Sequence, residues 1–133
     1  MSLAWYITRE RSIPGLDHFV NGKALAHAQE LLDRLAQTLG VHPLMYFFSA
    51  SPEELAGVAE DHGLDFQEDG VSLPAENWFS AEDGLNTVCA LMKAVAEIKD
   101  ERADRILRDL DEFDKVLKVA RDNGVNWHLA IDY

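Results

Sequence analysis

Apolar side chains recur every three or four positions in three long stretches of the chain, which is the spacing of an amphipathic helix. The second and third stretches follow one another without an intervening glycine or proline. One helix over residues 81–123 fits this pattern, but ordinary helix lengths favour two helices with a break near residues 99–102. The three apolar stripes are formed by Leu25, Ala28, Leu32, Leu35 and Leu39; by Leu85, Val88, Met92 and Val95; and by Ile106, Leu110, Phe113, Leu117 and Ala120.

Capping residues and glycines indicate where these helices begin and end. Asn21 is suited to cap the first helix and Gly40 to end it. Ser80 precedes the second helix, and Gly124 follows the third. A further short helix is predicted after Ser51, because a serine, a proline and a glutamate stand there in the order typical of a helix start.

Two segments lack a helical period. Residues 41–48 are too apolar for an exposed loop and too short for an ordinary helix. We therefore expect them to form either a turn of helix or an extended plug that fills the core. Residues 64–79 contain Gly70 and Pro74 and are predicted to be the longest loop, fixed near its end by Trp78 and Phe79.

Both ends of the chain have the character of β-strands. Residues 3–10 are rich in aromatic and β-branched side chains, and residues 125–133 alternate strictly between two faces. A lone strand leaves its backbone groups unpaired, so we expect the two ends to pair with each other. The predicted fold is α+β and forms a single domain over residues 1–133. It has about four helices packed on a small antiparallel sheet formed by the N- and C-terminal strands.

The net charge of −12 is distributed unevenly along the chain. No lysine or arginine lies between Arg34 and Lys93, and that stretch carries ten carboxylates. Such acidity disfavours nucleic acid and anionic membranes as partners, because both are polyanions. We interpret residues 35–92 as a negatively charged surface that binds a basic protein partner, as a non-catalytic immunity or inhibitor protein would. The residues expected to form this surface are Glu53, Glu54, Glu60, Asp61, Asp65, Glu68 and Asp69.

The last predicted helix mixes charges of both signs. Its carboxylates and basic side chains stand four residues apart, a spacing that brings them together on a helix surface. We expect four ion pairs on this helix: Glu101–Arg105, Asp104–Arg108, Asp111–Lys115 and Asp114–Lys118.

The alternative function is that of a small enzyme or ligand-binding domain, with its site on the polar face of the terminal sheet. His128 and Asp132 share that face but stand roughly 13 Å apart along the strand. A partner such as His18 or Glu10 would therefore be needed to complete a site. The competing interpretation is that this face is solvated, as one side of an antiparallel sheet commonly is. The sequence contains no nucleotide-binding or hydrolase motif that would assign an activity.

No pattern in the sequence indicates a cofactor or a metal ion. The five histidines form no paired zinc motif, and residues 61–70 lack the alternating ligands of a calcium loop. Cys89, the single cysteine, lies in an apolar run and is expected in the core. One thiol, no membrane-spanning run and no visible secretory leader fit a cytoplasmic protein. A third alternative is a homodimer that associates through the apolar helix after Ser80 or through residues 46–48.

Overall fold

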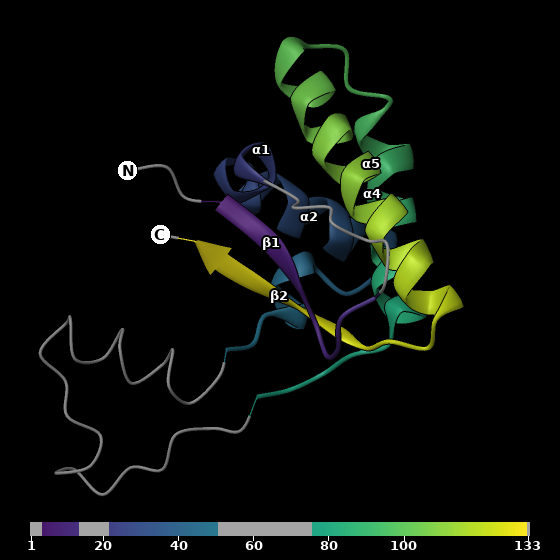
Figure 1. Cartoon of the computed structure of the whole chain (residues 1–133). Coiled ribbons are helices and arrows are strands. Elements are labelled where there is room, and N and C mark those ends of the chain that lie inside the picture. Colours follow the sequence, from purple (N-terminus) through teal and green to yellow (C-terminus); the bar gives the residue numbers. More distant parts are fainter. Residues whose placement is uncertain (1–3, 14–21, 51–75, 133) are drawn as a thin grey trace, which may run out of the picture.

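Four α-helices and a two-stranded sheet make up the described part of the fold (Figure 1). The computed structural model describes residues 4–13, 22–50 and 76–132. This architecture confirms the α+β prediction, with the sheet formed by the two ends of the chain. In chain order the elements are β1 (Ala4–Arg9), α1 (Lys23–His27), α2 (Gln29–Leu39), the 3₁₀ turn η1 (Leu44–Phe47), α4 (Ala81–Val95), α5 (Glu101–Asp122) and β2 (Trp127–Asp132).

The C-terminal strand β2 has backbone partners on both of its edges. On one edge it pairs antiparallel with β1 over six residues. On the other edge, Phe79 and Trp127 exchange two N–H···O bonds of 2.8 and 2.9 Å, and the Ser49 N–H donates to the Leu129 carbonyl at 3.1 Å. The terminal strand is therefore held from two directions by segments that are distant in the sequence.

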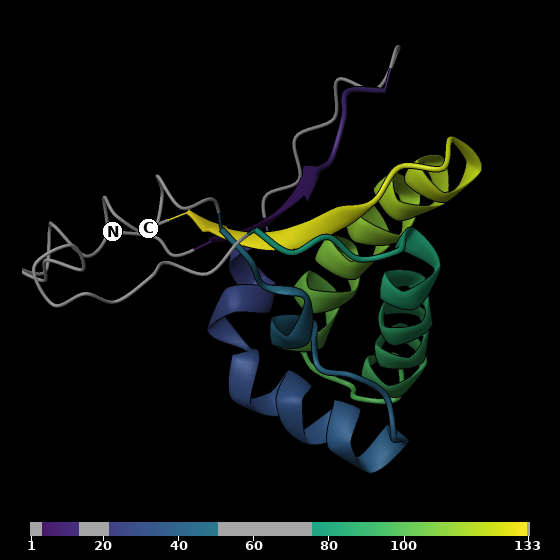
Figure 2. The same ribbon diagram turned by 90° about the horizontal axis from the view of Figure 1, so that it is seen from below.

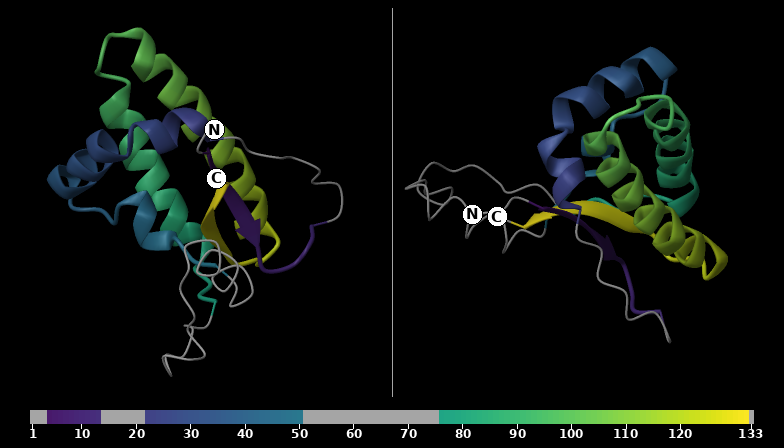
Figure 3. Two further views of the ribbon diagram at one scale, coloured as in Figure 1. Left: turned by 90° about the vertical axis from the view of Figure 1, so that its left-hand side faces the viewer. Right: turned by 90° about the horizontal axis from the view of Figure 1, so that it is seen from above.

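The helices gather on one side of the strands (Figures 2 and 3). Helices α4 and α5 lie side by side as a hairpin joined by residues 96–100, which confirms the two-helix interpretation. Side chains cap both helices, since Ser80 Oγ accepts from the Asp83 N–H and Asp100 Oδ1 accepts from the Ala103 N–H. Helix α1 packs on α5 and β1, and α2 packs on α4.

Eleven residues of the predicted apolar stripes lie in the core, whereas Leu39 at the end of the first stripe is exposed. Leu44 and Phe47 of η1 are also buried, so residues 41–48 do fill the core, as a 3₁₀ turn. Each fully buried Leu or Phe contributes about 1.5–3 kcal/mol through removal of its surface from water. The largest fully buried side chains are Trp5, Trp127, Phe47, Phe113, Leu25, Leu32, Leu44, Leu91, Ile106, Leu110, Leu117 and Leu129.

Two sequence predictions are corrected by the structure, and two others lie wholly or mostly outside the residues that it describes. The first predicted helix is divided at Ala28, whose N–H is shared between the carbonyls of Ala24 and Leu25. Cys89 is exposed on α4 and therefore not a core residue, because the buried face of α4 runs through Leu85 and Val88 instead. The short helix predicted after Ser51 lies outside the described residues, as does most of the predicted 64–79 loop.

Only the second half of α5 forms the predicted ion pairs. Lys115 pairs with Asp111 at 3.0 Å, and Lys118 pairs with Asp114 at 2.8 Å. The other two predictions are wrong: within the described residues, no ion pair joins Glu101 to Arg105 or Asp104 to Arg108. The guanidinium groups of the first half line a groove against α1 instead.

Trp127 connects the sheet to the helices. Its indole Nε1 donates to the Ser80 carbonyl at 3.0 Å, and its ring stacks on Phe47 with a centroid separation of 5.1 Å. Gly84 in the first turns of α4 lies directly against this ring, and a Cβ atom there would overlap the indole. The close approach of α4 to β2 therefore requires a glycine at this position.

Replacement of Gly84 by alanine is predicted to destabilise the protein. Alanine favours a helix over glycine by about 1 kcal/mol, but overpacking against a fully buried indole costs about 1–3 kcal/mol. We expect a net loss of up to about 2 kcal/mol in the free energy of unfolding, measured by urea denaturation. The control is Asn86→Ala at an exposed site of the same helix, where the change should stay within about 0.5 kcal/mol. A stabilised Gly84→Ala variant would contradict this packing.

Helix α1 is capped by a carboxylate from a different helix. Gly22 precedes α1 and offers no side chain for a cap. Asp109 of α5 supplies the missing acceptor: its Oδ2 lies 3.0 Å from the Ala24 nitrogen and 3.4 Å from the Leu25 nitrogen. Burial raises the pKa of Asp109, although the two backbone hydrogen bonds act in the opposite direction.

Asp109 is predicted to make stability depend on pH. Because its pKa is higher in the folded than in the unfolded state, its contribution is fully present below the ordinary value of 3.8 and is lost as pH rises through the folded value. Asp109→Asn keeps an oxygen acceptor for Ala24 and removes the charge. Relative to this variant, the native chain should gain stability as pH falls from 7 through the raised pKa, measured by urea unfolding at each pH. A relative loss of stability over that window would contradict the raised pKa.

Candidate functional site

The structure describes two of the four predicted catalytic side chains. His128 is the second residue of β2, lies opposite Thr8 of β1 and is fully buried. Glu10 is exposed, and its N–H donates to the Asn126 carbonyl at 2.9 Å. For Asp132 only the backbone is described, and its register partner is Ala4; His18 lies outside the described residues. Within the described residues, His128 and Glu10 form no hydrogen bond or ion pair with each other.

His128 is held by a carboxylate and an aromatic ring that precede α4. Its Nε2 lies 2.6 Å from Glu76 Oε2, and its Nδ1 lies 3.0 Å from the Leu129 carbonyl oxygen. The Trp78 ring lies beside the imidazole, with a centroid separation of 4.8 Å. These contacts connect the polar face of β2 to residues 76–80, which run along its second edge.

The two acceptors define the hydrogen positions on the imidazole. A backbone carbonyl only accepts, so Nδ1 of His128 donates to Leu129. The Nε2–Oε2 contact then holds one proton, which belongs either to an imidazolium or to a protonated Glu76. Both ring nitrogens are thus engaged in hydrogen bonds. General acid–base work by His128 would require one of these bonds to be exchanged for a bond to substrate.

The interpretation of the polar face as a solvated surface is wrong at the centre of β2. His128 and Ala130 are both buried, as are Trp127 and Leu129 on the other face of the strand. No sequence pattern indicates the partner of His128, because Glu76 stands 52 residues before it and belongs to no motif. The sequence predicts that Trp78 fixes the end of a loop. The position of its aromatic side chain beside a helix cap is the only local signal of its contact with His128.

The seven carboxylates predicted to bind a basic partner all lie outside the described residues. The structure does describe the residues on either side of them, up to Ala50 and from Glu76 onward. The Asn77 N–H donates to Ser49 Oγ at 2.8 Å, and the Ser49 N–H donates to the Leu129 carbonyl. Both flanks of residues 51–75 are therefore fixed next to each other on the second edge of β2.

Other predicted features are present only in part. Of the aromatic segment considered for a dimer contact, Tyr46 is half exposed, whereas Phe47 is fully buried. Among residues 4–13, 22–50 and 76–132, no group of three His, Cys, Asp or Glu side chains is placed to hold a metal ion. Over the same ranges, no helix combines the length and the apolar character needed to cross a bilayer.

Glu76→Ala is predicted to destabilise the fold, because it leaves the buried Nε2 of His128 without a partner. An orphaned buried polar group costs about 1–3 kcal/mol. Glu76→Gln should lose less, since an amide N–H can donate to a neutral imidazole. The matched control is Glu97→Ala at an exposed position, and urea unfolding measures all three. If Glu76→Ala were as stable as the control, the Glu76–His128 contact would not support the fold.

Comparison with known proteins gives no match: no protein-family model, no curated protein and no solved structure resembles this chain.

Proposed function

We propose that this chain is a non-catalytic interaction protein that binds a basic protein partner through the negatively charged stretch 35–92, as an immunity or inhibitor protein would. The charge distribution carries the proposal. Residues 51–75 contain seven carboxylates and no lysine or arginine, which accounts for more than half of the net charge of −12. All twelve lysines and arginines lie outside residues 35–92.

The anchored flanks of residues 51–75 support this proposal. Ser49 and Asn77 are hydrogen-bonded to one another, and Ser49 is also bonded to β2. A binding segment with fixed ends loses less conformational entropy on association than a free tail does. Clustered charge of one sign also raises the rate of encounter with a partner of opposite sign. A cytoplasmic location goes with this proposal.

The enzyme alternative has less support. Its strongest candidate residue, His128, is buried with both ring nitrogens hydrogen-bonded. A catalytic base needs an accessible nitrogen within reach of substrate.

The proposal predicts that the acidic residues of segment 51–75 are required for binding. The test variant replaces these seven carboxylates by their amides, and the control variant makes the same seven replacements at other carboxylates. The two variants have equal net charge and differ only in where charge is lost. The control positions are Glu10, Glu30, Asp33, Glu97, Glu101, Asp104 and Asp122.

The native chain and both variants are used as bait in lysate of the source organism at about 50 mM and about 500 mM salt, because screening weakens charge pairing steeply over this range. We expect one basic protein to be recovered at low salt by the native chain and the control, and to be lost at high salt or with the test variant. Recovery of that protein by the test variant, or recovery of no basic protein at all, would contradict the proposal.

A further inference from the structure

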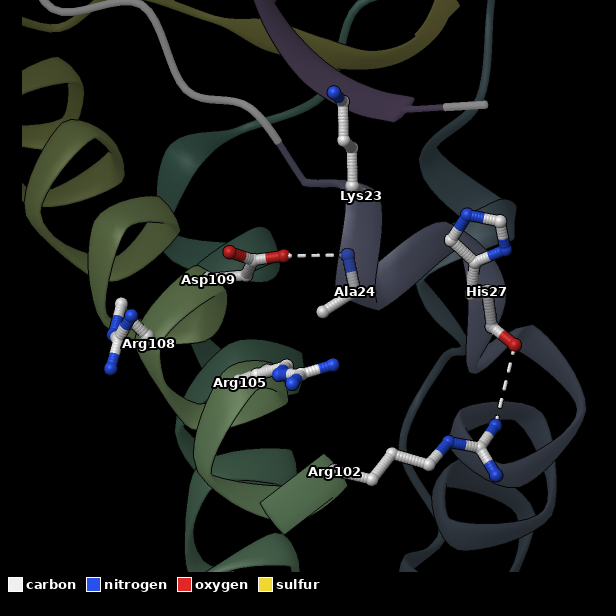
Figure 4. Close-up of a pocket in the computed structure, with 7 residues that line it drawn as sticks. All are labelled: Lys23, Ala24, His27, Arg102, Arg105, Arg108 and Asp109. Carbon is white, nitrogen blue, oxygen red and sulfur yellow. Dashed lines mark hydrogen bonds between the residues drawn. The ribbon is translucent and has the colours of Figure 1, made fainter. Parts of the chain in front are cut away.

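An open groove of about 520 Å³ lies between α1 and α5 and is lined mainly by cationic side chains (Figure 4). Its volume is typical of a site for a small molecule. One third of the lysines and arginines of this acidic chain line it, although the chain as a whole carries a charge of −12. The basic residues along the groove are Lys23 and His27 of α1 and Arg102, Arg105 and Arg108 of α5.

Most of these cations are not used by the fold. Within the described residues, the side chains of Lys23, Arg105 and Arg108 form no hydrogen bond or ion pair. Arg102 makes one long bond of 3.3 Å to the His27 carbonyl. The single carboxylate in the lining, Asp109, is directed to the backbone nitrogens at the start of α1 and not to a guanidinium group. The groove therefore presents N–H donors that have no acceptor among the described residues.

The spacing of the arginines matches a ligand with more than one anionic group. Arg102, Arg105 and Arg108 recur at three-residue intervals, so successive side chains start about 4.5 Å apart along the helix axis. Figure 4 shows Arg105 directed into the space between the helices, with Arg102 below it reaching toward His27. A guanidinium group offers two parallel N–H donors, a fork that fits phosphate oxygens.

The lining also limits the kind of ligand. Among the described residues that line the groove, His27 carries the only aromatic ring, and the aliphatic stems of the lysine and arginines add apolar surface to that of Ala24. A ligand with charged groups and no nucleobase fits such a lining better than a nucleoside does.

We propose that this groove binds a small anion that carries two or more phosphate groups. Arg102 and Arg105 supply the principal donors, and Lys23 and His27 complete the site from the opposite helix. The proposal is independent of the acidic stretch, since the two regions share no residue. Asp109 limits affinity, because its carboxylate stands beside the bound anion.

The test titrates the full chain with pyrophosphate at low ionic strength, followed by calorimetry and by the amide NMR signals of Ala24 and His27. The test variant is Arg102→Gln with Arg105→Gln. The control is Lys115→Gln with Arg121→Gln, which removes the same charge from exposed positions of the same helix. We expect pyrophosphate affinity to fall about tenfold or more in the test variant and less than about twofold in the control. Asp109→Asn should bind more tightly than the native chain.

An equal loss in both variants would show a diffuse charge effect and overturn the site, as would the absence of binding to the native chain at millimolar pyrophosphate. Tighter binding of a short single-stranded oligonucleotide, with shifts at the same amides, would replace the small anion by nucleic acid and overturn the proposal. If the double variant does not fold, Arg105→Gln alone is used, because Arg105 has no hydrogen bond or ion pair within the described residues. Its expected loss is about threefold or more, and unchanged affinity would contradict the proposal.

Discussion

The placement of β2 between two backbone partners is the constraint on which the rest of the described structure depends. A two-stranded sheet is marginal in water, and this one is completed on its second edge by residues 48–49 and by Phe79. The same strand carries Trp127, which is bonded to Ser80 and lies against Gly84 of α4. Backbone pairing and side-chain packing thus act on one strand and determine where α4 begins.

The position of β2 also fixes where the flanks of residues 51–75 lie, whereas the cationic groove is positioned by other contacts. The second edge of β2 fixes the flanks of the acidic residues 51–75 through Ser49 and Asn77. The cationic groove lies elsewhere, between α1 and α5, where Asp109 ties the two helices together. Net charge alone describes neither region, because the chain keeps its basic residues out of residues 35–92 and gathers four of them along one groove.

The sequence was sufficient for features governed by local periodicity. The helical stripes, the Ser80 cap and the pairing of the two terminal strands followed from spacing and from the need to pair backbone groups. Contacts between distant segments were not accessible in this way: nothing in the chain indicates that Glu76 meets His128, or that Asp109 caps α1. Within the part of the chain that the structure describes, Arg105 and Arg108 do not form the predicted ion pairs, because four-residue spacing permits an ion pair but does not require one.

Native-state hydrogen exchange measures whether the second edge of β2 holds the flanks of residues 51–75 in fixed positions. The amides to follow are those of Ser49, Phe79 and Trp127, with the amide of Leu110 in α5 as the reference for global unfolding. If the second edge is fixed, these amides should have opening free energies within about 1 kcal/mol of that reference. If Ser49 and Phe79 exchanged through openings about 3 kcal/mol or more below the reference, the flanks would not be fixed and the account would be contradicted.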